Sequence, residues 1–401
     1  MTTLTPTSPS TRSHARHVAL AILALATGGF AIGTTEFVTM GLLPQIADGV
    51  GIDIPSAGHV ISAYAVGVVV GAPVLAYVGA RFPRRGLLIS LMVAFLIGNA
   101  ASALAANYGL LVGARFLSGL PHGAFFGVAA LVAADLAEPH RRGRAVALTM
   151  LGLSVANVVG VPAATWLGQH VGWRSAYWLV AGLALLTIAL VRAFVPEIPG
   201  SRYGGRRELA LFTSPQVWLT LLAGAIGFGG LFAVYSYIAP AVTEVGGLPE
   251  SAVPVFLLAF GLGMVVGTWV AGRLVDWSMF RSMVIGSAGM GVALVVYFLV
   301  APAGWWALPL VFLITVIGSV FVLALQLRLM HVAGDSQTLG AASNHAALNI
   351  ANALGAWLGG LVIAGGHGYR SPALVGAGLS LGGFVVVLVS ARLHVSSRSR
   401  S

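Results

Sequence analysis

Residues 18–43 read VALAILALATGGFAIGTTEFVTMGLL, an apolar run with a single charged side chain, Glu36. About 20 apolar residues are enough for a helix to cross the hydrocarbon core of a bilayer. A carboxylate inside such a helix is costly, and it commonly pairs with a cation or serves a function. The stretch therefore predicts a transmembrane helix and marks Glu36 as a candidate functional residue.

The composition extends this interpretation to the whole chain of 401 residues, of which 58% are hydrophobic and only 8% are charged. Soluble domains carry roughly a quarter charged residues. The apolar runs are continuous and do not alternate as barrel strands do, so helices are expected. The formal charge of +10 is spread over short loops, which argues against nucleic-acid binding. The absence of cysteine excludes disulfides and thiolate metal sites.

Twelve apolar runs, separated by charged or Pro/Gly-rich breaks, predict an all-α polytopic membrane protein with twelve transmembrane helices. The predicted spans are 18–43, 57–80, 86–106, 109–135, 143–168, 174–195, 215–242, 251–275, 282–301, 305–330, 339–365 and 372–392.

The arginines predict the orientation of these spans. All but three of the 21 basic residues fall in the N-terminal tail, the even-to-odd loops or the C-terminal tail. Arg174 and Arg370 lie on the opposite side, and Arg115 lies within a span. Because positive residues favour cytoplasmic loops, both termini are expected in the cytoplasm of a multi-pass plasma-membrane protein.

The domain organisation follows from the longest internal loop, which divides the spans into two groups of six. The expected parts are a disordered cytoplasmic N-tail (1–17), an N-terminal bundle (18–195), a cytoplasmic linker (196–214), a C-terminal bundle (215–392) and a cytoplasmic C-tail (393–401).

The two groups of six also share sequence. The matching pairs, 195 or 196 residues apart and in corresponding places, are GVVVG (67–71) with GMVVG (263–267), ANVVG (156–160) with ANALG (351–355), and GWRS (172–175) with GYRS (368–371). A repeat displaced by six helices is parallel rather than inverted. Two parallel six-helix bundles around a central cavity are therefore expected.

Four motifs carry a resemblance to a known family. They are GARFPRRGLL (79–88) in the second loop, RFLSGLPHG (115–123) in helix 4, GLSVANVVGVPAATWLG (152–168) in helix 5, and GTTEFVTMGLLPQIA (33–47) in helix 1. With them the chain resembles the major facilitator superfamily, and within it the twelve-helix drug:proton antiporter branch. The helix-1 sequence is similar to the subgroup of sugar-efflux and chloramphenicol-resistance proteins.

The resemblance implies a conformational role for the residues that match these motifs: Arg81, Arg84, Arg85, Gly152, Gly160, Pro162, Gly272 and Asp276. The sequence also departs from the family pattern. Ala80 stands where the second-loop motif has an aspartate, and Val161 separates the glycine and proline of the helix-5 element. The segment 272–281 of the second half retains Gly272 and Asp276.

Two charged residues lie well inside the predicted spans, Glu36 in helix 1 and Arg115 in helix 4. At 1.5 Å rise per residue, both lie about 10 Å below the outer surface. Glu36 is a candidate proton carrier, with Arg115 as its partner and His122, two turns deeper, as a relay. The alternatives are a static pair that joins the two helices, an Arg115 that bonds helix-1 carbonyls, and a structural histidine.

Polar and aromatic residues on other spans are candidates for substrate binding. They are Asn157 in helix 5, Tyr235 and Tyr237 in helix 7, and His345, Asn349 and Asn352 along one face of helix 11. Hydrogen bonding or packing between helices is the alternative for each.

The predicted function is proton-coupled efflux of small lipophilic compounds by alternating access. The partners are then a small-molecule substrate, protons and the lipid bilayer, with the protein acting as a monomer. No cofactor or metal is expected, and the chain is not expected to be an enzyme. A sugar or metabolite exporter and a proton-coupled importer remain alternatives, and a membrane enzyme or receptor is a remote one.

Overall fold

The computed structural model describes residues 9–79, 81–138, 141–200, 212–333 and 337–398. Over these residues the chain is helical and contains no strand. The first half contains α1 (Pro9–Gly41), α2 (Leu43–Val50), α3 (Ile54–Gly79), α4 (Arg84–Leu104), α5 (Tyr108–Leu136), α6 (Arg142–Val155), the π-helical turn η2 (Ala156–Gly160), α7 (Val161–Val171) and α8 (Arg174–Phe194).

The second half follows the same plan. It contains α9 (Pro215–Gly227), α10 (Gly229–Tyr235), α11 (Ile238–Pro240), η4 (Ala241–Val245), η5 (Glu250–Ala252), α12 (Val253–Trp277), α13 (Met279–Val300), η6 (Ala301–Ala307), α14 (Leu308–Ala333), α15 (Gln337–Val362), η7 (Ile363–His367) and α16 (Pro372–Arg398).

Twelve crossings are present. Eleven stretches of described helix are long and apolar enough to span a membrane, and one of them, Met279–Val332, comprises both α13 and α14. Large apolar side chains such as Leu185, Val292 and Leu299 are more than half exposed. An apolar surface of this kind suits lipid rather than water. The predicted all-α, twelve-helix membrane fold is confirmed.

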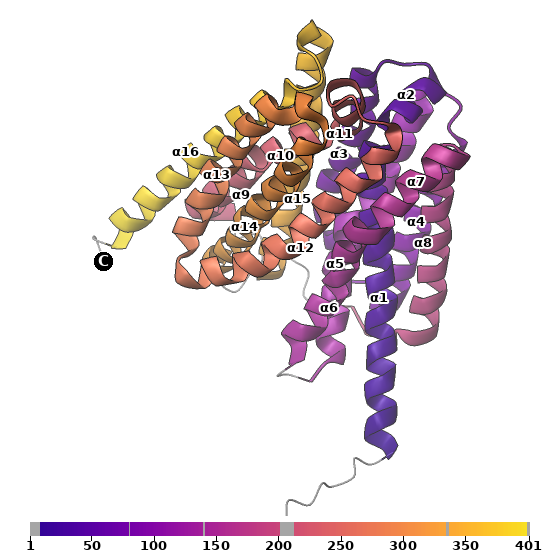
Figure 1. Cartoon of the computed structure of the whole chain (residues 1–401). Coiled ribbons are helices and arrows are strands. Elements are labelled where there is room, and N and C mark those ends of the chain that lie inside the picture. The colour runs from indigo at the N-terminus through magenta and orange to yellow at the C-terminus, as the bar shows by residue number, and fades with distance from the viewer. Residues whose placement is uncertain (1–8, 80, 139–140, 201–211, 334–336, 399–401) are drawn as a thin grey trace, which may run out of the picture.

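The helices form two groups, coloured indigo to magenta and orange to yellow in Figure 1. Across the boundary, α15 packs on α3, and α12 packs on η2 and α7. We call the end of the molecule that contains α2 and α11 the α2 end. The opposite end, where α8 ends and α9 begins, is the linker end. Figure 1 shows the two groups close together at the α2 end and diverging toward the linker end.

Several helix boundaries differ from the sequence prediction. α1 begins at Pro9 and α16 continues to Arg398, so parts of the predicted tails (1–17 and 393–401) are helical. A helix continues past its apolar run because its backbone hydrogen bonds do not depend on hydrophobic side chains. Residues 1–8, 399–401 and most of the predicted linker (196–214) lie outside the described residues. The sequence prediction also lacked α2, a short helix that packs on α3.

Candidate functional site

Glu36 lies in the interior of α1, 7% exposed, at the boundary between the two halves. Its neighbour Phe37 packs against rings from the second half. Phe37 stacks on Phe232 at 6.4 Å between centroids, and it meets Tyr235 edge-on at 5.7 Å. Within the described part of the chain, the Glu36 carboxyl makes no hydrogen bond and no ion pair. A buried carboxyl without such partners is costly to keep as an ion, and such groups in membrane helices commonly serve a function.

The rings around Phe37 form what we call the aromatic cluster. Its members are Phe37 of α1, Phe228 beside α10, Phe232 and Tyr235 of α10, and Phe260 of α12. Tyr235 and Phe260 stack at 3.7 Å between centroids, and the Tyr235 hydroxyl is buried without a hydrogen-bond partner. The cluster therefore connects α1 to the second half with apolar contacts and leaves one polar group among them.

Arg115 of α5 is fully buried, but it does not form the predicted ion pair with Glu36. Its Nη1 donates to the Thr35 hydroxyl at 3.0 Å, and its Nη2 donates to the Thr35 carbonyl at 3.1 Å. Successive residues on a helix point about 100° apart, so Thr35 faces α5 while Glu36 faces elsewhere. The bond to a helix-1 carbonyl matches one of the alternatives that the sequence left open.

Other polar groups complete the surroundings of Arg115. The Thr35 hydroxyl donates to Asn99 Oδ1 at 2.6 Å, and Asn99 donates to its own helix at Phe95. The guanidinium lies 4.4 Å from the ring centroid of Tyr64 and 5.3 Å from that of Tyr177. Cation–π contacts of this kind stabilise a desolvated arginine. The sequence analysis did not identify these residues, although Asn99 is a polar residue inside an apolar span.

His122 lies further along α5, toward the linker end. Its Nδ1 and the Tyr64 hydroxyl are 3.0 Å apart, and both side chains are buried. Beyond it, Phe126 stacks on His345 of α15 with centroids 5.8 Å apart and planes 3° from parallel. The structure thus brings His122 and His345 into one neighbourhood, which sequence spacing did not predict.

The predicted substrate-binding residues have different surroundings. Asn157 and Asn349 each donate to a carbonyl of their own helix, and each leaves a buried Oδ1 without a partner. Both amide atoms of Asn352 lack partners. Tyr237, by contrast, donates to the Ala356 carbonyl at 2.7 Å. Tyr237, between α10 and α11, therefore connects this crossing to α15, whereas Tyr235 belongs to the aromatic cluster.

The fifth crossing packs tightly on α1. A Cβ at Gly152 would overlap the Ala26 carbonyl, and one at Gly160 would approach the ring of Phe30. Pro162 is the second residue of α7, just after the π-helical turn η2, and it lacks the backbone N–H that a regular helix would use. These residues let the two helices approach closely and allow the fifth crossing to depart from regular α-helix.

The arginines of the second loop contact the start of the linker. Arg85 pairs with Glu197 at 2.8 Å, and the Arg84 backbone N–H donates to the Ile198 carbonyl at 2.8 Å. Arg81 is exposed between α3 and α4. In the second half, Gly272 and the exposed Asp276 lie near the C-terminal end of α12. Glu197, at the start of the linker, is thus the acidic partner of the second loop, where the loop's own motif has Ala80 in place of an aspartate.

At the α2 end, hydrogen bonds join the halves. Gln45 of α2 donates to Glu250 Oε2 at 2.8 Å, and Gln169 of α7 donates to the Glu250 carbonyl at 3.0 Å. Nearby, hydrogen bonds from Ser56 lower the pKa of Asp53, which precedes α3. No sequence motif marked the two glutamine contacts, because their partners are more than 80 residues apart.

Arg328 lies near the end of the predicted span 305–330, and we counted it there with the arginines of the loop that follows. α14 extends to Ala333, and Arg328 is 2% exposed. It donates to Gln216 Oε1 at 3.1 Å and lies 4.7 Å from the ring centroid of Phe280. A second arginine is therefore buried in the protein, close to the linker end.

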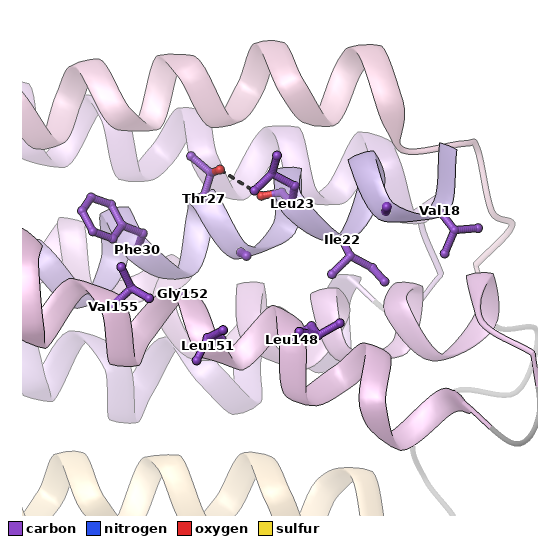
Figure 2. A pocket seen from close by; sticks show the side chains of 11 residues that line it. Val18, Ile22, Leu23, Thr27, Phe30, Leu148, Leu151, Gly152 and Val155 are labelled. Carbon is purple, nitrogen blue, oxygen red and sulfur yellow. Dashed lines mark hydrogen bonds between the residues drawn. The ribbon is translucent and has the colours of Figure 1, made fainter. Parts of the chain in front are cut away.

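An apolar groove of about 580 Å³ lies between α1 and α6 toward the linker end. Figure 2 shows the side chains of Ile22, Phe30, Leu148 and Leu151 around it, with the Thr27 hydroxyl turned back to the Leu23 carbonyl. The groove therefore offers almost no free polar group. Among the described residues, no cluster of three metal-ligating side chains occurs.

Comparison with known proteins agrees with this architecture. Residues 25–344 match the family described as Major Facilitator Superfamily. The chain is 40% identical to "Inner membrane transport protein YdhP" of Escherichia coli K12, over 92% of this chain and 96% of that protein. It is 33% identical to a "Chloramphenicol resistance protein" of Streptomyces lividans, over 84% of this chain and 87% of that one.

A solved structure shares the fold. A D-xylose-proton symporter superposes with a TM-score of 0.75 at 17% identity, over 92% of this chain and 97% of that one. At this identity the likeness concerns the fold alone. The family match and the relatives cover most of the chain, including both halves. The chain therefore belongs to the Major Facilitator Superfamily and is a multi-pass membrane transporter.

Proposed function

We propose that this transporter exports small lipophilic compounds in exchange for protons. The observation that carries the proposal is the Glu36 carboxyl, which is buried, makes no hydrogen bond among the described residues, and interacts electrostatically with Tyr235 of the aromatic cluster. A carboxyl in such a place binds a proton readily and releases it when its surroundings become polar. Movement of one half against the other supplies that change.

The arrangement of the two ends supports alternating access. The aromatic cluster and the two glutamine contacts to Glu250 join the halves toward the α2 end, while the two groups of helices diverge toward the linker end (Figure 1). We assign the linker end, with both termini, to the cytoplasm and the α2 end to the outside of the cell membrane. In this assignment the conformation faces inward, and the bundles 18–195 and 215–392 move as units of one monomer.

The lining of the site supports a lipophilic substrate. The rings of Phe37, Phe232, Tyr235 and Phe260 lie together, Phe37 being next to Glu36 in sequence, and the buried Tyr235 hydroxyl has no hydrogen-bond partner. Binding sites for small molecules combine apolar walls with a few polar groups in this way. The relative named for chloramphenicol resistance makes chloramphenicol a suitable first probe.

The experiment compares wild type and Glu36→Gln in everted membrane vesicles with an imposed pH gradient. Wild type should accumulate labelled chloramphenicol, or a member of a panel of lipophilic drugs and sugars, when the vesicle interior is acidic. Glu36→Gln should lose gradient-driven accumulation and keep binding, because glutamine preserves the shape of the neutral carboxyl. Movement of the compound in the same direction as the protons would identify a proton symporter, as an importer would be, and would contradict antiport. Gradient-driven accumulation by Glu36→Gln at wild-type rate would remove Glu36 from the mechanism.

A further inference from the structure

A hydrogen-bonded pair of titratable side chains lies buried beside the proposed site. Tyr64 of α3 and His122 of α5 meet at 3.0 Å between the phenol oxygen and Nδ1. Because Nδ1 is used in this bond, the other ring nitrogen, Nε2, is left for a second partner. No hydrogen bond of Nε2 occurs over the described ranges of the chain. A histidine that holds a hydroxyl on one nitrogen can accept a proton there and release one from the other.

Arg115 connects this pair to the turn that carries Glu36. Its guanidinium holds the Thr35 side chain and carbonyl and covers the face of the Tyr64 ring at 4.4 Å. Arg115 therefore fixes the direction in which the Tyr64 hydroxyl points. It is a positioning residue here, because it holds Thr35 and Tyr64 in place and takes no part in the proton transfer itself.

On the other side of His122, the pair is covered by a contact between the halves. The ring of Phe126 lies 5.3 Å from that of His122 and stacks on His345 of α15. Since α5 and α15 belong to different halves, movement of the halves separates these two rings. The charged and titratable groups around the pair are Glu36 of α1, Arg115 of α5, Tyr177 of α8 and His345 of α15.

We propose that Tyr64 and His122 relay protons between Glu36 and the linker end, and that the Phe126–His345 stack covers the relay at the contact between the halves. The inference rests on the proposed proton-coupled function. In the relay, the Tyr64 hydroxyl proton passes to Nδ1 of His122 while the Tyr64 oxygen takes the proton that leaves Glu36. The imidazolium then releases the proton on Nε2. One proton enters and one leaves, and only O–H and N–H bonds change.

The test uses the full-length protein in proteoliposomes, with chloramphenicol or the panel compound that wild type moves as the probe. Two rates are measured: net transport driven by a pH gradient, and exchange of labelled for unlabelled probe at equal pH. Tyr64→Phe and His122→Gln should lower net transport at saturating probe by roughly tenfold or more, as expected for a lost proton-transfer group. Exchange and apparent affinity should stay near wild type, because exchange needs no net proton movement.

A matched pair serves as control. His59 Nδ1 and the Tyr108 hydroxyl are 2.7 Å apart, exposed, and at the α2 end of α3 and α5. His59→Gln and Tyr108→Phe remove the same kind of bond away from the proposed route, and both should keep wild-type net transport. In addition, Phe126→Leu should raise proton entry without probe, followed with a pH-sensitive dye inside the vesicles.

The outcomes separate the relay from the proposed function. Wild-type net transport by both Tyr64→Phe and His122→Gln would overturn the relay and leave antiport intact. Equal loss of exchange and net transport would overturn it in favour of a structural or substrate-contact role. If an imposed pH gradient drives no net transport of any panel compound by wild type, the antiport proposal is overturned, and the relay with it.

Discussion

Arg115 binds Thr35 and not its neighbour Glu36, with Nη1 3.0 Å from the Thr35 hydroxyl and Nη2 3.1 Å from the Thr35 carbonyl. The arginine is therefore neutralised by dipoles rather than by the carboxylate. This relationship leaves the Glu36 carboxyl at the aromatic cluster without an ion pair. Two roles are therefore carried by different residues. Thr35 and Arg115 hold α1 against α5, and Glu36 is left to bind a proton.

The first prediction concerns the Thr35 hydroxyl, which accepts from Arg115 and donates to Asn99. Thr35→Val keeps the shape but leaves two buried polar groups short of a partner. We expect it to lower the free energy of unfolding by about 1–3 kcal/mol, measured by thermal unfolding in detergent. Thr35→Ser retains the hydroxyl and should lose less than half as much. Equal stability of Thr35→Val and wild type would show that the hydroxyl network contributes nothing.

The second prediction concerns closure at the α2 end. Gln45→Ala and Glu250→Ala remove the side-chain bond between α2 and η5. The chain contains no cysteine, so a reporter such as Ala57→Cys, buried at this end, can be labelled without background. We expect either variant to increase the labelling rate of the reporter by an impermeant maleimide by roughly two- to tenfold, since one exposed hydrogen bond is worth about 0.5–1.5 kcal/mol.

The matched control for this closure is Asp48→Ala, which removes an exposed polar side chain from the same helix α2. It should leave the labelling rate unchanged. If Asp48→Ala accelerates labelling as much as Gln45→Ala does, the effect comes from α2 itself and not from its bond to Glu250.

The fold was predictable from sequence to a large extent. Apolar runs of the length that a bilayer requires predicted all twelve crossings, because hydrocarbon permits few alternatives to a helix of fixed length. Helix ends were less predictable. The polar turns at Pro9 and Arg398 are helical without being apolar. The predicted span 305–330 included Arg328, but not its burial.

The sequence predicted the depth of Glu36 and Arg115 in the membrane, but not the directions in which their side chains point. The rise per residue placed Glu36 and Arg115 at one level, and the bond to Thr35 confirms that their levels are adjacent. Which of two neighbouring residues faces α5 depends on the rotation of α1 about its axis, and that rotation is set mainly by its packing on α6 and α8. For the same reason, the sequence did not show that Tyr235 and Tyr237 lead to different surroundings.

The third prediction contrasts two arginines near the linker end. Arg328 is buried and shares Gln216 Oε1 with the Ser390 hydroxyl, whereas Arg85 and Glu197 are partly exposed. Arg328→Ala should destabilise the protein by about 2–4 kcal/mol, through lost packing of the long side chain and the loss of a buried hydrogen bond from a charged group. Arg85→Ala should cost less than about 1 kcal/mol because water screens an exposed pair. Thermal unfolding of the two variants side by side measures the difference, and a larger loss for Arg85→Ala would reverse this ranking.

The last prediction addresses the Tyr235 hydroxyl, which is buried in the aromatic cluster without a partner. Tyr235→Phe keeps the ring that stacks on Phe260 and removes a polar group whose burial is unfavourable. We expect the variant to be as stable as wild type or more so, by up to about 1 kcal/mol. If the hydroxyl binds substrate, the same variant should show an apparent KM for transport raised by roughly threefold or more, the value of about one hydrogen bond, with little change in maximal rate. Phe260→Ala is the contrasting variant, because it removes the stacking partner and should lower stability. A Tyr235→Phe protein that unfolds at lower temperature would show instead that the hydroxyl has a structural partner in another conformation of the transport cycle.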